Sequence, residues 1–119
     1  MSVTESYLAY VLEQLEYMGA ITARKMFGGA GIYKDNIFFA LIADDVLYFK
    51  ANDTNRAEYE TRGMEPFRPY GDDSFVMSYY EVPEEILEDR DELHKWAGKA
   101  IQVATLSKVK NIKRKRKRL

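Results

Sequence analysis

Eight cationic side chains are gathered in the last twelve residues of this 119-residue chain, and no Asp or Glu lies among them. They are Lys108, Lys110, Lys113, Arg114, Lys115, Arg116, Lys117 and Arg118. A cluster of this kind releases counterions when it contacts a phosphate backbone, so it predicts weak contact with DNA or RNA that does not depend on sequence. Charge alone leaves three alternatives open: a solvated extension, an acidic protein partner, or docking onto the chain's own acidic surface.

A glycine-rich segment has the composition of a phosphate-binding loop, and Arg24 and Lys25 stand shortly before it. Its residues are Gly28, Gly29, Ala30 and Gly31. Such a loop binds phosphate when a helix begins directly after it, but here the chain continues in a β pattern, with neither GxxxxGK[ST] nor GxGxxG. We therefore expect a hairpin turn in which glycines supply positive φ or let the backbone pass closely. The alternative is a small-molecule-binding or catalytic domain that uses this loop, with Arg24 and Lys25, as an anion or phosphate site.

Paired carboxylates and one histidine complete the candidates for chemistry. Acid–base or metal work would need Asp44 and Asp45, or Asp72 and Asp73, to converge with further ligands, and turn chemistry accounts for both pairs. His94 stands at the edge of a helical apolar stripe, and no nucleophile motif is present. The chain has no cysteine, which excludes disulfides and cysteine-ligated metals. We predict no catalytic residues, no cofactor and no metal, and a protein that is not an enzyme.

Two amphipathic helices and a series of strands must position these residues. One apolar stripe at helical spacing is formed by Tyr7, Leu8, Val11, Leu12, Leu15 and Met18, and a second by Leu93, Trp96, Ala97, Ala100, Ile101 and Ala104. Strands are expected over residues 21–27, from Ile32 onward, and over residues 37–42, 46–50 and 75–82. A short helix is expected at 55–62 and one helical turn at 84–87. The segment 66–70 should be irregular or an edge strand, because it contains two prolines. The connecting turns are short, which favours antiparallel pairing. The predicted fold class is α+β, an antiparallel β-sheet meander flanked by an N-terminal and a C-terminal amphipathic helix.

Aromatic side chains are frequent in the predicted strands. Tyrosines on a sheet can stack nucleic-acid bases, but that mode needs basic residues interleaved with the rings. The strand region is acidic overall, so we expect core and cross-strand packing for six tyrosines: Tyr33, Tyr48, Tyr59, Tyr70, Tyr79 and Tyr80. We also expect Trp96 to be a core anchor between the last helix and the sheet.

Charge divides the chain into two parts. Residues 1–107 hold 10 basic and 19 acidic residues, a net charge of −9, whereas residues 108–119 carry +8. We therefore predict a folded domain over 1–107 and a basic tail over 108–119, which can extend the last helix because Lys and Arg are good helix formers. The longest apolar run, residues 37–43, is too short to span a bilayer, and the N-terminal pattern is no secretory signal. We predict a cytoplasmic protein without a membrane partner.

Several blocks in the middle of the chain resemble the TfoX/Sxy N-terminal-domain family. They are Lys25 to Tyr33 (Lys-Met-Phe-Gly-Gly-Ala-Gly-Ile-Tyr), Phe39 to Ile42, Leu47 to Lys50, Pro66-Phe67, and Met77 to Pro83, in family order. The resemblance implies an α+β domain with an antiparallel sheet and flanking helices. The family takes its name from bacterial competence regulators that act on transcription and carry a second domain after this one, where this chain has its basic tail. It therefore implies a regulatory or adaptor protein that binds a protein partner or itself, with the tail adding non-specific attraction to DNA or RNA.

Overall fold

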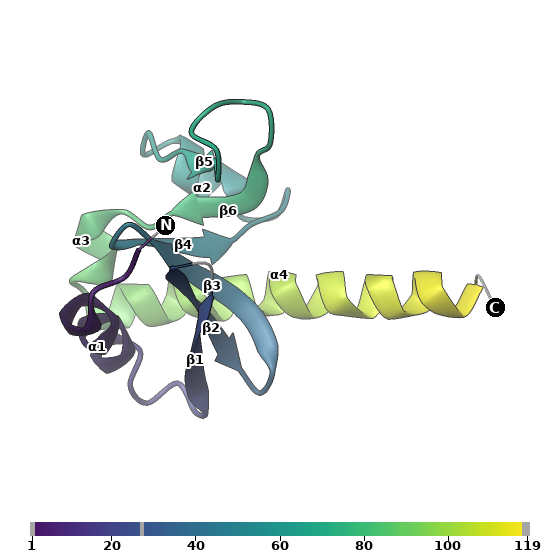
Figure 1. The fold of residues 1–119 in the computed structure, drawn as a ribbon. Helices are drawn as coiled ribbons and strands as arrows, with labels where there is room; N and C mark the ends of the chain where they lie inside the picture. The colour runs from purple at the N-terminus through teal and green to yellow at the C-terminus, as the bar shows by residue number, and fades with distance from the viewer. Residues whose placement is uncertain (1, 27, 118–119) are drawn as a thin grey trace.

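The computed structural model describes residues 2–26 and 28–117, with side chains as far as residue 114, and contains one six-stranded antiparallel sheet (Figure 1). The strands are β1 (Ile21–Met26), β2 (Gly29–Lys34), β3 (Ile37–Ala43), β4 (Val46–Lys50), β5 (Pro66–Phe67) and β6 (Met77–Glu81), in the spatial order β1-β2-β3-β4-β6-β5. The helices are α1 (Glu5–Gln14), α2 (Arg56–Glu60), α3 (Glu84–Leu87) and α4 (Arg90–Lys117). The predicted α+β class, the antiparallel meander and both flanking helices are confirmed.

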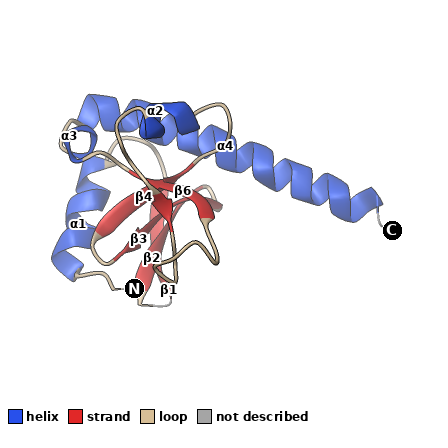
Figure 2. Cartoon of the chain, turned by 90° about the horizontal axis from the view of Figure 1, so that it is seen from above, coloured by secondary structure: helices blue, strands red, loops and turns tan. Residues whose placement is uncertain are grey.

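One face of the sheet is covered by helices, and the main core lies there. Side chains of α1, α4 and the sheet form a single buried cluster that includes Val11, Phe39, Phe49 and Leu93. Figure 2 shows α4 crossing this side of the sheet and then continuing past it. The opposite face, called the open face below, carries a smaller cluster around Leu41. Among the described residues, no helix is long and apolar enough to cross a bilayer.

Tight turns between the strands explain one of the carboxylate pairs. The β2–β3 and β3–β4 hairpins turn at Asp35-Asn36 and Asp44-Asp45, and all four residues have φ between 50° and 67°. Such left-handed two-residue turns match the twist of antiparallel strands and suit Asp and Asn. The carboxylate of Asp45 also accepts hydrogen bonds from the backbone N–H (2.8 Å) and the hydroxyl (3.0 Å) of Thr4, the N-cap of α1. The Asp44-Asp45 pair therefore has a structural role, as turn chemistry predicted.

The glycine-rich segment is mostly a strand, which corrects the expectation of a turn. Gly29, Ala30 and Gly31 belong to β2, and Ala30 pairs with Lys25 of β1 on one side and Ile42 of β3 on the other. Only Gly28, with φ of 81°, has the left-handed backbone expected of a glycine turn. Phe27, which the sequence placed at the end of the first strand, lies outside the described residues.

Close packing explains why glycines stand inside this strand. A Cβ atom at Gly29 would lie 2.3 Å from the carbonyl oxygen of Ile42, which is backbone and cannot move aside. A Cβ atom at Gly31 would lie 2.7 Å from the Cε atom of Met26. The first contact is with the sheet itself, so Gly29 allows β2 and β3 to approach each other. The expectation that a glycine lets the backbone pass closely is therefore confirmed at Gly29.

Replacing Gly29 by alanine should lower the free energy of unfolding by about 1–3 kcal/mol, because overpacking against backbone shifts the strands. The matched control is Gly98→Ala in the exposed face of α4, where an added Cβ atom meets nothing within 4 Å. That substitution should raise stability by about 0.8–1 kcal/mol through helix propensity. Urea unfolding followed by circular dichroism measures both. Equal stabilities for the Gly29→Ala variant and the unmodified chain would contradict the close approach.

Trp96 lies in the core, as predicted, but its main ring partner comes from a helix. The indole is 8% exposed and meets the Tyr59 ring of α2 edge-on, with centroids 4.8 Å apart. Tyr59 in turn contacts Tyr80 of β6, with centroids 5.7 Å apart. The Arg62 guanidinium covers the outer side of the indole at 5.1 Å. Trp96 thus connects α4 to the sheet through α2.

Candidate nucleic-acid interface

The basic tail is the end of α4. The first half of the helix buries one stripe of side chains: Leu93, Trp96, Ala97, Ala100, Val103 and Ala104. From Lys108 to Arg114 every residue is exposed, and the helix projects past the sheet (Figure 1). At 1.5 Å per residue, residues 108–117 extend the helix by about 15 Å. The change of composition at Ser107 therefore falls inside one continuous helix.

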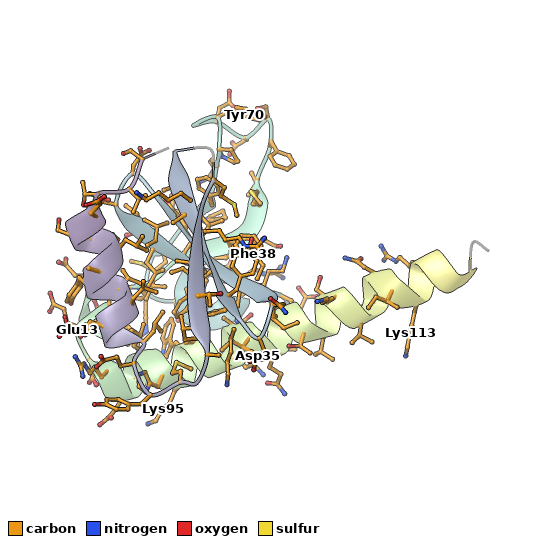
Figure 3. All side chains as sticks on the ribbon, turned by 60° about the horizontal axis from the view of Figure 1, so that its bottom comes forward. Glu13, Asp35, Phe38, Tyr70, Lys95 and Lys113 are labelled. Carbon is orange, nitrogen blue, oxygen red and sulfur yellow. The ribbon has the colours of Figure 1, made fainter. Side chains whose placement is uncertain are left out.

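The projecting segment presents cations to solvent. Lys108, Lys110, Lys113 and Arg114 are exposed, and none forms an ion pair with another described residue. Figure 3 shows Lys113 pointing away from the body of the protein. Positions 110, 113 and 114 have the i, i+3, i+4 spacing that places side chains on one side of a helix. The predicted contacts Lys115, Arg116 and Lys117 lie outside the described side chains, and Arg118 lies outside the described residues altogether.

The same segment carries exposed aliphatic side chains. Leu106, Val109 and Ile112 are 51%, 43% and 44% exposed. They recur every third residue, so they form a slowly turning stripe beside the cations. A stripe of this kind on a projecting helix is a feature of surfaces that bind another macromolecule.

The open face of the sheet carries a row of aromatic rings with two cations among them. Tyr33 and Phe38 have ring centroids 5.2 Å apart, and Phe38 and Tyr79 have centroids 5.4 Å apart. The Arg24 guanidinium lies over the Tyr33 ring at 5.5 Å, and the Lys50 amine lies over the Tyr79 ring at 5.1 Å. Cross-strand packing is confirmed for Tyr33 and Tyr79. Tyr59 packs in the core from α2, as predicted, whereas the prediction is wrong for Tyr70, which is 75% exposed in the loop between β5 and β6. The expectation that basic residues are not interleaved with the rings is wrong for this part of the face.

Lys50 stands where the open face meets α4. Its amine donates a hydrogen bond to the Ser78 hydroxyl at 2.8 Å, and partial burial lowers the pKa of the amine. Two clefts between the ends of strands and α4, of about 230 and 340 Å³, share Lys50 and Ser107 in their walls. Lys108 lines the first cleft and Lys110 lines the second. The projecting helix and the open face are therefore one continuous surface.

An apolar hollow of about 520 Å³ also opens on this face. Its walls come from β1, β2, β3, β5 and β6 and from the loop that joins the last two, and they include Gly29, Ala30, Leu41, Phe67, Tyr70 and Met77. The glycine segment thus borders a hollow lined by apolar side chains.

The anion site predicted as the alternative is not assembled. The backbone of Gly29, Ala30 and Gly31 pairs with neighbouring strands, so it forms no loop of convergent N–H groups. Arg24 lies on Tyr33, while the Lys25 amine is 3.8 Å from the Glu5 carboxylate. The two cations therefore have separate partners.

The remaining candidates have structural partners. The Nε2 atom of His94 is 3.0 Å from the backbone oxygen of Gln14, which joins α4 to α1. Asp72 accepts hydrogen bonds from the Ser74 backbone and hydroxyl, and Asp73 pairs with Arg68 at 2.9 Å. Among the residues the structure describes, no group of three or more His, Cys, Asp or Glu side chains is placed to hold a metal ion.

These observations define a small α+β domain whose last helix leaves the body as a basic, partly aliphatic rod. Residues 13–104 match the model of the TfoX N-terminal domain, and the chain belongs to this family. A similar protein is the DNA transformation protein TfoX1 of Aliivibrio fischeri (strain ATCC 700601 / ES114), 29% identical over 68 residues. That alignment covers 56% of this chain and 32% of the relative, so the chain matches about a third of that protein's length.

Proposed function

We propose that this protein is a non-enzymatic regulatory or adaptor protein related to the control of DNA transformation, and that the end of α4 contacts nucleic acid without sequence preference. The family membership and the name of the similar protein support the regulatory role. The observation that carries the nucleic-acid contact is that Lys108, Lys110, Lys113 and Arg114 of the projecting helix are exposed and form no ion pair with a described residue. Cations of this kind bind phosphates mainly by releasing counterions.

The distribution of acidic residues favours this contact. Six of the 19 acidic residues stand together at α3 and the start of α4: Glu84, Glu85, Glu88, Asp89, Asp91 and Glu92. Glu92 and Lys108 are 16 residues apart on one helix, which corresponds to about 24 Å. Screening acts within about 8–10 Å at physiological salt, so this acidic end has little effect on phosphates near Lys108. Acidic residues at the N-terminus of α4 and basic residues toward its C-terminus also interact favourably with the helix dipole.

The test compares two pairs of cations on the same helix. Lys110→Gln with Arg114→Gln removes two charges from the projecting end, and Lys95→Gln with Lys99→Gln removes two from the part that packs on the body. Each phosphate contact contributes about tenfold to affinity at low salt by counterion release, so the first pair should weaken binding at least tenfold. The second pair should leave binding nearly unchanged. Fluorescence anisotropy with random-sequence duplex DNA measures both.

A truncated chain of residues 1–107 completes this experiment. The truncated chain should still unfold cooperatively, because the buried core ends at Ala104, and it should not bind the duplex. Equal loss of affinity in the two double variants would show that net charge matters rather than the end of α4. Unchanged binding by the truncated chain would contradict the proposed function.

The aliphatic stripe on the same segment supports a second candidate, binding to a protein partner or to another copy of this chain. Leu106, Val109 and Ile112 are exposed although they are apolar. Sedimentation velocity of the full chain and of the truncated chain, both without nucleic acid, tests self-association. A dimer formed by the full chain and not by the truncated chain would favour this candidate.

A further inference from the structure

The rings and cations of the row on the open face come from five of the strands, and each contacts the next: Arg24 lies on Tyr33, Tyr33 on Phe38, Phe38 on Tyr79, and Lys50 on Tyr79. Arg24 comes from β1, Tyr33 from β2, Phe38 from β3, Lys50 from β4 and Tyr79 from β6. Tyr33 and Phe38 are partly exposed, while Tyr79 is 5% exposed and lies beneath the Lys50 amine. Partly exposed rings beside cations on a sheet form an arrangement on which unpaired bases stack while the phosphates meet positive charge.

The row leads directly to the basic helix. Phe38, Lys50 and Tyr79 line the same cleft as Lys108 and Asn111 of α4. Lys50 also lines the neighbouring cleft, together with Lys110. A single strand that contacts the projecting helix can therefore pass Lys50 and reach Phe38 without leaving the protein surface.

Charge along this path is suitable for a phosphate backbone. Arg24 and Lys50 form no ion pair with a described residue; they contact tyrosine rings, and Lys50 also bonds to a serine hydroxyl. Asp53 borders the second cleft, but its carboxylate is 2.6 Å from the Arg56 guanidinium. Glu81 pairs across the strands with Tyr48, away from Tyr33 and Phe38. Asp35, which is exposed in the β2–β3 turn, is a second acidic residue next to the path.

We propose that the open face binds single-stranded nucleic acid, with bases on Tyr33 and Phe38 and the phosphate backbone passing Lys50 to reach Lys108 and Lys110. This inference rests on the proposed contact between α4 and nucleic acid, and adds the class of ligand. A duplex keeps its bases stacked inside, so it offers the rings nothing and meets only the helix. An unpaired strand engages both surfaces and should therefore bind more tightly.

The experiment measures the affinity of the full chain for fluorescein-labelled oligo-dT, oligo-rU and a DNA duplex of the same length at low salt. Tyr33→Leu and Lys50→Met each remove one element of the path while keeping apolar volume. The matched control is Tyr48→Leu, which changes a half-buried tyrosine on the same face that packs on Phe67 with centroids 5.0 Å apart. Loss of one stacked base should weaken single-strand binding about five- to hundredfold. Duplex binding should change less than twofold.

A third variant changes a surface residue and should leave the fold intact. Arg24 is exposed on an edge strand, and Arg24→Gln should weaken single-strand binding several-fold with an unchanged melting temperature. The oligo-dT and oligo-rU arms separate DNA from RNA as the source of the strand.

The outcomes separate this inference from the proposed function. In one outcome, single-strand affinity is unchanged in all three open-face variants (Tyr33→Leu, Lys50→Met and Arg24→Gln), while the double variant Lys110→Gln with Arg114→Gln binds every ligand more weakly. The open face is then not a binding surface, and the proposed function of α4 stands. If single strands bind through Tyr33 and Lys50 but the α4 variant has no effect on any ligand, the proposed role of α4 fails. The path from Lys50 to Lys110 then fails with it, and only base stacking on the open face stands. Absence of binding to all three ligands would overturn both.

Discussion

Replacing Trp96 by alanine should lower the free energy of unfolding by about 3–5 kcal/mol, the usual cost of removing a buried indole. The side chain is 8% exposed and meets Tyr59 edge-on at 4.8 Å. Removing the indole leaves a cavity between α4 and α2, and Tyr59 loses the ring against which it packs. Edge-to-face ring pairs contribute about 0.5–1.5 kcal/mol beyond their buried area.

Urea unfolding of the Trp96→Ala variant has to be followed by far-ultraviolet circular dichroism, because Trp96 is the chain's single tryptophan. Trp96→Phe keeps a ring and should cost clearly less. Tyr17→Ala is the surface control, since this aromatic side chain is 90% exposed, and it should change stability by less than about 0.5 kcal/mol. A cost below about 1 kcal/mol for Trp96→Ala would mean that the contact with α2 does not hold the helix to the body.

Local sequence patterns were enough to predict most of the elements. The turns at Asp35-Asn36 and Asp44-Asp45 follow from residues that tolerate positive φ, and they fix β2, β3 and β4 as an antiparallel meander. Pro66 lies in the short edge strand β5, where its missing N–H group costs nothing to the sheet. Asp89 caps α4, its carboxylate accepting a hydrogen bond from the Glu92 N–H at 3.2 Å.

The glycine segment shows where the local patterns were insufficient. Gly29 and Gly31 have the composition of a turn, yet their conformation is set by contacts with Ile42 and Met26 that lie in other strands. The local sequence does not distinguish a turn from a close approach between two strands, because glycine is typical of both. The buried amide of Gln14 is similar: it donates to the Leu87 carbonyl at 2.8 Å and accepts from Arg90 at 3.1 Å, partners more than 70 positions away.

The aromatic row on the open face depends on register. Tyr33 pairs with Phe38, but the neighbouring Ile32 pairs with Ala40, so a bulge at this point shifts the faces of the strands. A one-residue shift moves a side chain to the other side of a sheet. The net negative charge of the strand region did not indicate that Arg24 and Lys50 would lie on the same face of the sheet as the rings. The exposure of Lys108, Lys110, Lys113 and Arg114, by contrast, was evident from composition, since a run of like charges without acidic residues needs no tertiary contact to be exposed.

Binding of the full chain to duplex DNA should fall steeply as salt is raised. Each neutralised phosphate contributes a slope of about −0.9 in the logarithm of affinity against the logarithm of salt concentration. Of the eight cations in residues 108–119, about four to six simultaneous phosphate contacts would give a slope of about −4 to −5. Between about 0.05 and 0.2 M salt, the affinity should therefore fall by a factor of about 250 to 1,000.

The variant Lys110→Gln with Arg114→Gln makes this slope a test of position as well as of charge. If both side chains contact phosphates, the slope should become shallower by about 2, whereas Lys95→Gln with Lys99→Gln should leave it unchanged. Anisotropy titrations across a salt series give the three slopes. The helix explains why the effect is concentrated: Lys110, Lys113 and Arg114 occupy one side, so a duplex that meets two of them meets the third. A slope between 0 and about −1 for the full chain would mean that the cations of the projecting helix contact solvent and not phosphate.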